Sequence, residues 1–169
     1  MKKVKVELKL NGKQFKTEVE ARTLLVDLVR ELADQTATHI GCDTSNCGAC
    51  TVLLDGRPVK SCTVLAAQAG GRDVKTLEGL SEDPLMKKLK DQFLDKHGLQ
   101  CGFCTSGMLI SSYSLLRKKQ KPDELEIRES LSGNICRCTG YGGIVDAIKS
   151  VQPGIEKERV APAPEIQRN

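Results

Sequence analysis

The chain has 169 residues, of which 39% are hydrophobic and 28% charged, and a formal net charge of +4. This length allows one ordinary domain or two small ones. Aromatic residues make up only 3% and tryptophan is absent, which argues against a base-stacking surface and a nucleic-acid partner. Charged residues interrupt the apolar ones after the N-terminal lysines, so we expect no signal peptide, no membrane span and a cytoplasmic protein.

The first 76 residues predict a small α+β domain. Apolar and charged residues alternate on both sides of Asn11-Gly12, which is a strong β-hairpin pattern. From Thr23 the period becomes helical, with Thr23 placed to cap one apolar face made by Leu24, Leu25, Leu28, Val29 and Leu32. A second hairpin is predicted from residues 51–54 and 58–61, which flank the turn residues 55–57.

Strand patterns largely vanish after residue 79, and helical patterns follow. Ser81 before Pro84 indicates a helix start, and Gly98 stands where that helix should end. Three further helices are predicted at about residues 105–119, 122–131 and 139–151, and the basic cluster at 117–121 is interpreted as a helix end. We therefore expect a helical bundle domain at residues 77–152 and a proline-rich extended tail at 153–169.

Eight cysteines carry the chemistry of this sequence. A chain without an export signal keeps its thiols reduced in the cytosol, which favours metal ligation over disulfides. The first set has C-x4-C-x2-C spacing with a distant fourth member: Cys42, Cys47, Cys50 and Cys62. This is the plant-type [2Fe–2S] spacing. Gly41 and Gly48 free the backbone to wrap an anionic cluster and turn N–H groups toward it.

The second set consists of two close pairs, Cys101 with Cys104 and Cys136 with Cys138. Four thiolates again suit one [2Fe–2S] cluster. Each pair is followed directly by a threonine and then by a predicted helix. We therefore expect two helix N-termini, capped by Thr105 and Thr139, to direct their partial positive charge at one anionic cluster.

Other uses of these cysteines fit less well. Structural zinc is the main alternative, but zinc sites favour two short Cys knuckles or added histidines, which do not occur here. A Rieske centre needs two histidine ligands, and His39 and His97 lie outside both motifs. A catalytic cysteine lacks a recognisable general base nearby. We also find no nucleotide-binding glycine motif, P-loop or triad, so no catalytic residue is assigned.

The two motifs together resemble the small iron-sulfur subunit, or N-terminal iron-sulfur region, of the xanthine oxidase family of molybdenum hydroxylases. The resemblance covers roughly residues 3–152. Its most specific part is QCGFC followed by CRCTGY, because plant-type ferredoxins share only the first cysteine motif. The resemblance implies an N-terminal β-grasp domain of the plant-type ferredoxin-like kind and a C-terminal four-helix bundle. Ser45 and Ser106 stand where the family usually has glycine and proline, and neither departure falls on a cysteine.

The family pattern also implies roles for individual residues. Carried over, it makes the first cysteine set the ligands of a flavin-side cluster and the second set those of a molybdenum-side cluster. Gln100, directly before Cys101, matches a family glutamine whose amide contacts the molybdopterin of a partner subunit. Without the family, Gln100 would be interpreted as an ordinary polar loop residue.

The same resemblance implies partners and a function. The chain looks like the separate small subunit of carbon monoxide dehydrogenase and aldehyde oxidoreductases, in a heterotrimer or a dimer of heterotrimers. Electrons would pass from molybdopterin on a large subunit, through both [2Fe–2S] clusters, to FAD on a medium subunit. The holoenzyme would be an aldehyde or carbon monoxide oxidoreductase. The alternative is a free-standing ferredoxin-like electron carrier, which would have no need of Gln100.

Overall fold

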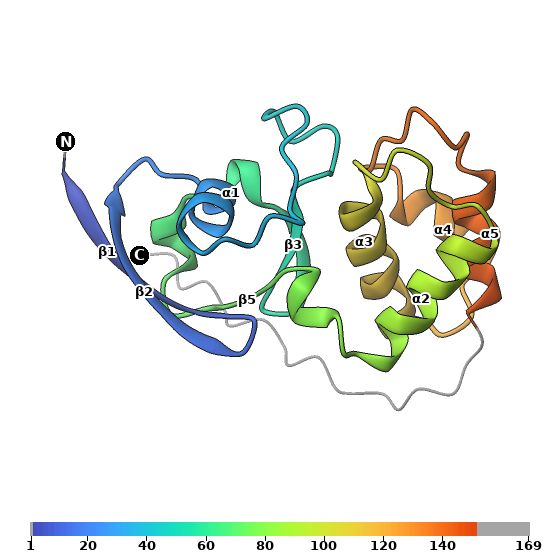
Figure 1. The fold of residues 1–169 in the computed structure, drawn as a ribbon, viewed down its shortest axis with the longest axis horizontal. Coiled ribbons are helices and arrows are strands. Elements are labelled where there is room, and N and C mark those ends of the chain that lie inside the picture. The colour runs from blue at the N-terminus through green and yellow to red at the C-terminus, as the bar shows by residue number, and fades with distance from the viewer. Residues whose placement is uncertain (1, 152–169) are drawn as a thin grey trace.

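The structure of the chain is a computed structural model that describes residues 2–151. Figure 1 shows a sheet with short helices at one end and a group of longer helices at the other. This is the mixed α+β architecture that the sequence predicts. The predicted tail at residues 153–169 lies outside the described residues. Among the described residues, no helix combines the length and the apolar character needed to cross a lipid bilayer.

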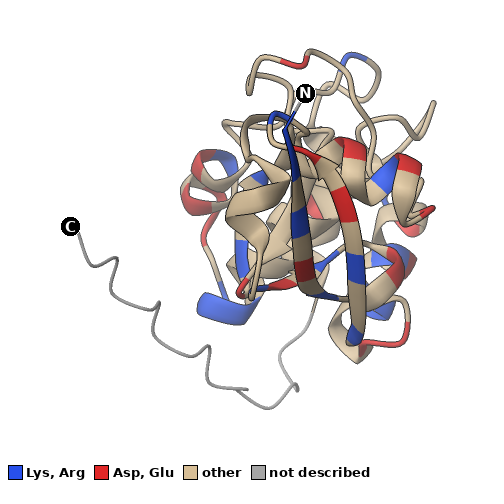
Figure 2. Cartoon of the chain, turned by 90° about the vertical axis from the view of Figure 1, so that its left-hand side faces the viewer, with Lys and Arg blue, Asp and Glu red and all other residues tan. Residues whose placement is uncertain are grey.

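The N-terminal hairpin forms as predicted. Strand β1 (Lys3–Leu10) pairs antiparallel with β2 (Lys13–Glu20). Asn11 and Gly12 both have positive φ angles, 50° and 84°, which match the twist of the flanking strands. Charges of both signs follow one another along this hairpin (Figure 2). Because β2 is an edge strand, these charges discourage a second chain from pairing with it.

The sheet has five strands in the order β2-β1-β5-β3-β4. Strand β5 (Asp73–Lys75) is parallel to β1 and antiparallel to β3 (Thr51–Leu54), and β3 pairs in turn with β4 (Arg57–Lys60). The turn of the second hairpin is one residue shorter than predicted, so Arg57 begins β4. The three residues of β5 are too few to show an alternating pattern, which is why the sequence did not reveal this strand.

The first predicted helix forms with a different start and an unexpected geometry. Helix α1 (Leu25–Asp27) continues as the π-helix η1 (Leu28–Leu32). Thr23 does not cap it. Instead the backbone of Thr23 bonds to Glu20 and Ala66, and Leu24 occupies the cap position. Leu32, predicted on the buried face, is 49% exposed because the wider π turn shifts residues around the helix axis.

Four helices fill the other end of the molecule, as predicted: α2 (Pro84–Asp95), α3 (Thr105–Lys118), α4 (Glu124–Ser130) and α5 (Gly142–Ser150). Short 3₁₀ turns link the sheet and the helices: η2 (Ser61–Thr63), η3 (Ala66–Ala69) and η4 (Glu78–Leu80). The start signal of α2 is Asp83 rather than Ser81, because the Asp83 carboxylate accepts hydrogen bonds from the N–H groups of Leu85 and Met86 at 2.8 and 3.1 Å.

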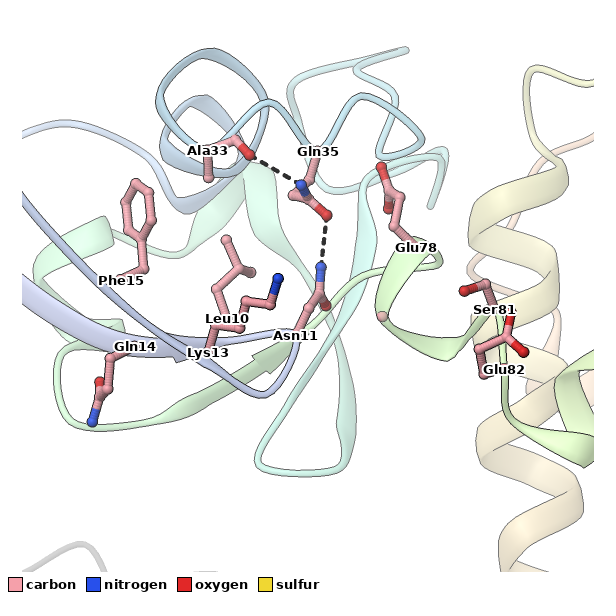
Figure 3. Close-up of a pocket in the computed structure, with 11 residues that line it drawn as sticks. Leu10, Asn11, Lys13, Gln14, Phe15, Ala33, Gln35, Glu78, Ser81 and Glu82 are labelled. Atoms are coloured by element: carbon pink, nitrogen blue, oxygen red, sulfur yellow. Dashed lines mark hydrogen bonds between the residues drawn. The ribbon is translucent and has the colours of Figure 1, made fainter.

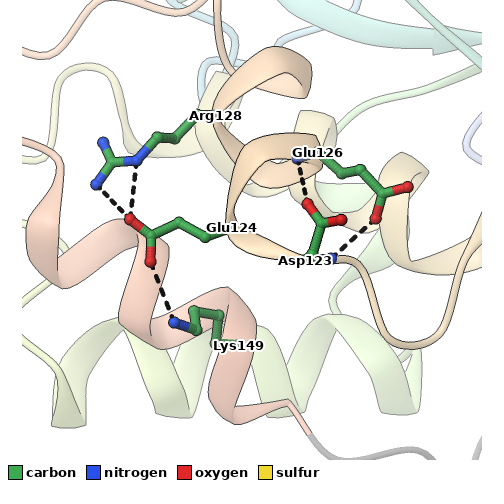
Figure 4. Close-up of polar contacts among 5 residues, drawn as sticks. All are labelled: Asp123, Glu124, Glu126, Arg128 and Lys149. Carbon is green, nitrogen blue, oxygen red and sulfur yellow. Dashed lines mark hydrogen bonds and ion pairs between the residues drawn. The ribbon is translucent and has the colours of Figure 1, made fainter.

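Helix α4 begins at a capping box and is tied to α5 by charge. Asp123 and Glu126 exchange the two hydrogen bonds of the box, which places the helix start after the predicted residue 122 (Figure 4). Glu124 bonds to Arg128 one turn along α4 and to Lys149 on α5. These side chains are about half-exposed, so solvent screens both contacts and they add little to stability.

The sheet and the helices each have an apolar core, and the two cores meet at β3. Val6, Leu8 and Val52 lie in the core under the sheet, whereas Met86, Leu89 and Ile144 lie among the helices. Leu53 belongs to the helical core although it sits on β3. Because neighbouring strand residues point to opposite faces, β3 contributes to both cores and fixes α3 against the sheet.

A polar network beside an open pocket ties the hairpin turn to the segment that links sheet and helices. Figure 3 shows the Asn11 amide donating to Gln35 at 2.7 Å. Asn11 also bonds twice to the fully buried Thr76, and the Thr76 hydroxyl donates to Glu78. Asn11 thus joins three separate segments of the chain.

Replacing Asn11 by glycine should lower the free energy of unfolding by about 1–3 kcal/mol, the cost of leaving a buried donor unpaired. Glycine keeps the positive φ angle, so the loss reports on the amide and not on backbone strain. Chemical denaturation of the wild type and the Asn11→Gly variant measures the difference. A change below about 0.5 kcal/mol, the usual size for surface substitutions, would contradict this role.

Candidate metal centres

The loop that carries the first three cysteines has an unusual backbone. Asp43, Ser45 and Gly48 all have positive φ angles, of 54°, 63° and 72°. Two of these residues are not glycine, so the loop holds a conformation that costs free energy for ordinary residues. Ser45 takes the left-handed conformation that glycine adopts at least cost. The wrapped loop that the sequence predicts is therefore present, although Gly41 does not supply a positive φ.

The wrapped loop turns three N–H groups toward one sulfur. The backbone N–H groups of Thr44, Asn46 and Cys47 donate to Cys42 Sγ over 3.4, 3.3 and 3.3 Å. These bonds, led by that from Cys47, lower the pKa of the Cys42 thiol to about 6. Hydrogen bonds to a sulfur favour its thiolate form, which is the form that binds iron.

The other cysteines of the first set lie deeper. Cys50 and Cys62 are buried, and burial raises the pKa of Cys50 to about 11, with Cys62 and Cys47 close enough to contribute. The Ser61 hydroxyl donates to the carbonyl of Cys50 at 2.7 Å and fixes η2 beside the start of β3. The second hairpin thereby brings the distant Cys62 beside Cys50. Binding of a positive ion favours the thiolate form of such a thiol.

The second set also comes together, across a long stretch of chain. Cys138 Sγ lies 3.4 Å from Cys101 Sγ, and both residues are exposed. Cys104 is half-buried and Cys136 is buried. Burial, followed by the neighbouring Cys136, raises the pKa of Cys104 to about 12. Burial also acts to raise the pKa of Cys136, but hydrogen bonds, chiefly from Thr139, outweigh it and lower that pKa.

The two threonines do not cap helices as predicted. Helix α3 starts directly after Cys104, and the buried hydroxyl of Thr105 has no partner among the described residues. Helix α5 starts only at Gly142, because Tyr141 takes a left-handed conformation before it. The Thr139 hydroxyl instead lies 3.1 Å from Cys136 Sγ and accepts from the N–H of Tyr141. Only the helix start at α3 therefore adjoins a cysteine.

The residues present fit an anionic two-iron cluster at each set. All eight cysteines are free thiols, the first loop directs N–H groups to sulfur, and Thr105 and Ser106 offer unpaired buried hydroxyls next to Cys104. Within residues 2–151, no three Cys, His, Asp or Glu side chains converge closely enough to hold one metal ion. Two irons and two sulfides need a wider cage than one ion, so four thiolates around a cluster stand farther apart.

The loops of the two sets lie against each other. The N–H of Ile135, one residue before Cys136, donates to the carbonyl of Cys47 at 2.8 Å. On another side, His39 Nδ1 lies 2.8 Å from the carbonyl of Phe103, and the two rings stack with centroids 4.8 Å apart. Local sequence patterns did not point to these contacts, because their partners are far apart along the chain.

Gln100 lies at the outer edge of the second set. Its side chain is exposed, as is that of the adjacent Cys101. The histidines lie outside the cysteine sets as the sequence predicts, but His39 is more than a loop residue because it joins the two cysteine loops. The exposed side of the second set is thus the part of either set that a partner could reach most directly.

Comparisons with known proteins agree with this geometry. Residues 3–99 match a family described as "2Fe-2S iron-sulfur cluster binding domain", and residues 76–149 match one described as "[2Fe-2S] binding domain". The chain is 46% identical to the caffeine dehydrogenase subunit gamma of Pseudomonas sp. (strain CBB1), over 89% of this chain and 92% of that protein. It is 38% identical to the xanthine dehydrogenase iron-sulfur-binding subunit of Escherichia coli O157:H7, over 86% and 92%.

Crystal structures show the same similarity. A chain of quinoline 2-oxidoreductase from Pseudomonas putida 86 superimposes with a TM-score of 0.84 at 46% identity, covering 88% of this chain and 91% of that one. The aldehyde oxidoreductase of Desulfovibrio desulfuricans ATCC 27774 superimposes with a TM-score of 0.80 at 35% identity. That match covers 87% of this chain but only 17% of the larger protein.

Proposed function

Because the chain belongs to the small iron-sulfur subunits of the molybdenum hydroxylase family of oxidoreductases, we propose that it carries electrons between two larger subunits. The electrons would come from molybdopterin on a large subunit and leave to FAD on a medium subunit, within a heterotrimer or a dimer of heterotrimers. A bound [2Fe–2S] cluster supplies one-electron redox chemistry. The chain's own residues position the clusters, bond to their sulfurs and exclude water.

The observation that carries this proposal is the hydrogen bond that joins the loops of the two cysteine sets. From Cys47, a path through the backbone and one hydrogen bond reaches Ile135 and then Cys136. The path consists of covalent bonds and that single hydrogen bond. An electron-transfer subunit needs such a short connection, whereas two unrelated structural metal sites would not.

The proposed ligands follow from the two sets. Cys42, Cys47, Cys50 and Cys62 would bind the flavin-side cluster, and Cys101, Cys104, Cys136 and Cys138 the molybdenum-side cluster. The sheet order supports a β-grasp domain over residues 1–76, and the four helices support a bundle domain over 77–152. The exposure of Cys101, Cys138 and Gln100 supports a partner's approach on the molybdenum side.

Gln100→Ala should slow turnover of the assembled complex by roughly fivefold, the effect of losing one hydrogen bond of about 1 kcal/mol. Both clusters should remain, because Gln100 is not among the proposed ligands. Steady-state turnover combined with iron analysis checks this. The exposed Gln14 on β2, at the hairpin, provides a control, and Gln14→Ala should leave the rate unchanged. Equal rates for both variants would return Gln100 to an ordinary loop residue.

Anaerobic purification of the chain with its partners tests the function as a whole. We expect about four irons per chain and two distinct reducible [2Fe–2S] signals by electron paramagnetic resonance (EPR). Co-purification with a flavoprotein and a molybdopterin-containing chain supports the subunit role. A stable, iron-loaded monomer that no such chain accompanies would favour the free-standing carrier. A colourless, zinc-loaded protein would contradict both.

The substrate of the complex depends on another subunit. Relatives of this chain are named for caffeine, nicotine, xanthine and aldehydes at similar levels of identity. The aldehyde or carbon monoxide substrate expected from the sequence therefore stays a prediction. Assay of the purified complex against these compounds tests it.

A further inference from the structure

The side chain of Asn134 lies where the sheet loop, the helices and the second cysteine set meet. It is only 6% exposed, and both of its polar atoms are paired. Its Nδ2 donates to the carbonyl of Gly48 at 3.3 Å, inside the first cysteine loop. Its Oδ1 accepts from the hydroxyl of Ser111, on α3, at 2.8 Å. One buried amide therefore connects two parts of the fold.

On the side of Gly48 the backbone packs tightly against this amide. A Cβ atom added to Gly48 would lie 2.6 Å from Asn134 Nδ2 and would also meet the carbonyl of Gly133. A Cβ atom on Gly107 of α3 would meet the carbonyl of Gly48. Backbone therefore touches backbone here. The buried Gly48 carbonyl accepts from the N–H and the hydroxyl of Thr51 at 3.2 and 2.6 Å, and Asn134 is the donor that reaches it from the loop of the second set.

The chain that follows Asn134 leads directly into the second set. The N–H of Ile135 donates to Cys47, and the N–H of Cys136 donates to the Tyr141 hydroxyl at 2.9 Å. The same hydroxyl lies 3.3 Å from the carbonyl of Asn134. The backbone of residues 134–136 is thus held on both sides, and the Asn134 side chain holds it against Gly48.

We propose that Asn134 is a positioning residue that sets the separation of the two cysteine sets by bonding to Gly48 and Ser111 together. This inference rests on the proposed function, because the separation matters only when both sets hold clusters. Asn134 itself touches no cysteine sulfur. It acts through the loop of Gly48 and through its own chain neighbours, Ile135 and Cys136.

Replacing Asn134 by leucine removes both hydrogen bonds and keeps a side chain that branches at the same carbon. The Gly48 carbonyl keeps its two Thr51 donors but loses its bond to residue 134, so this side chain no longer holds the first loop against residues 134–136 and the loop can move away. Ser111→Ala is the matched control, because it removes only the bond on the helix side. Asn134→Asp is a second variant, which keeps the acceptor for Ser111 but loses the donor to Gly48.

The test uses the purified complex with its full-length chains, fully reduced, and measures the magnetic interaction between the two centres by EPR. In Asn134→Leu we expect both signals to remain, their mutual splitting to shrink, and amide hydrogen exchange at Ile135 to become faster. Ser111→Ala keeps the bond to Gly48 and should shrink the splitting less than Asn134→Leu does. An unchanged splitting in Asn134→Leu, with both signals present, would overturn the proposal.

Two further outcomes are informative. If Asn134→Leu loses a cluster, Asn134→Asp is measured instead, and a reduced splitting supports the role while an unchanged one overturns it. Both variants could lose only the signal of the cluster at the second cysteine set and keep the other signal as in the wild type. Asn134 would then support one site alone, and the proposal would be wrong. A wild-type complex without two signals would instead refute the proposed function, so the two failures are distinguishable.

Discussion

Replacing Cys136 by serine should remove one of the two cluster signals and about half of the iron, because each [2Fe–2S] cluster needs four thiolates. The other signal should remain. Its proposed ligands lie on the loop before β3 and on η2, and none of them depends on the Cys136 side chain. EPR of the reduced complex and iron analysis measure both effects.

The reciprocal variant makes this result specific. Cys62→Ser should remove the other signal and leave the one that Cys136→Ser abolishes. Each protein should keep its helical content, because the apolar cores under the sheet and among the helices are separate apart from Leu53. Loss of both signals in either variant would contradict two sites that load independently.

Replacing Ile135 by proline should slow electron transfer between the clusters while both stay bound. Proline has no N–H, so the hydrogen bond to the Cys47 carbonyl is lost and the shortest connection between the sets is broken. We expect a slowing on the order of ten- to a hundredfold, the range that a displacement of about 1 Å can cause in a positioned reaction. Stopped-flow measurement of cluster reduction in the assembled complex follows each step.

Ile135→Val is the matched control for this variant. Valine keeps the N–H and trims a side chain that is 53% exposed, so transfer should proceed at the wild-type rate. Equal slowing in the valine variant would show that the side chain and not the hydrogen bond carries the effect. Wild-type rates in Ile135→Pro, with both clusters present, would exclude the backbone path through Cys47.

Much of the fold followed from local sequence patterns. The Asn11-Gly12 turn between alternating strands predicted the first hairpin with its bounds nearly correct, because positive φ angles and period-two alternation are local properties. The helical faces behind Pro84 and before Gly98 predicted α2 in the same way. The sequence predicted that a helix forms more accurately than it predicted the residue at which the helix begins, since several residues near each start can act as caps.

The wrong cap assignments share one physical cause. Thr23, Ser81, Thr105 and Thr139 all have side chains able to cap, but the choice among neighbouring candidates depends on the path of the preceding chain. Asp83 caps α2 because the backbone turns at that residue. Helix α5 begins after Thr139 because Tyr141 takes a left-handed conformation, and regular helical backbone starts only at the next residue. The π turn of η1 likewise has no local signature in the sequence.

The sequence by itself determined the secondary structure classes, the two sets of cysteines and the family to which the chain belongs. The spacing of the cysteines and the residues that flank them are fixed by covalent order, so no tertiary structure was needed to recognise the two sets. Only the tertiary structure decided that Ile135 meets Cys47, that His39 stacks on Phe103 and that Asn134 joins Gly48 to Ser111. These contacts arise when α3 packs on β3, and packing between distant segments leaves no periodic pattern along the chain.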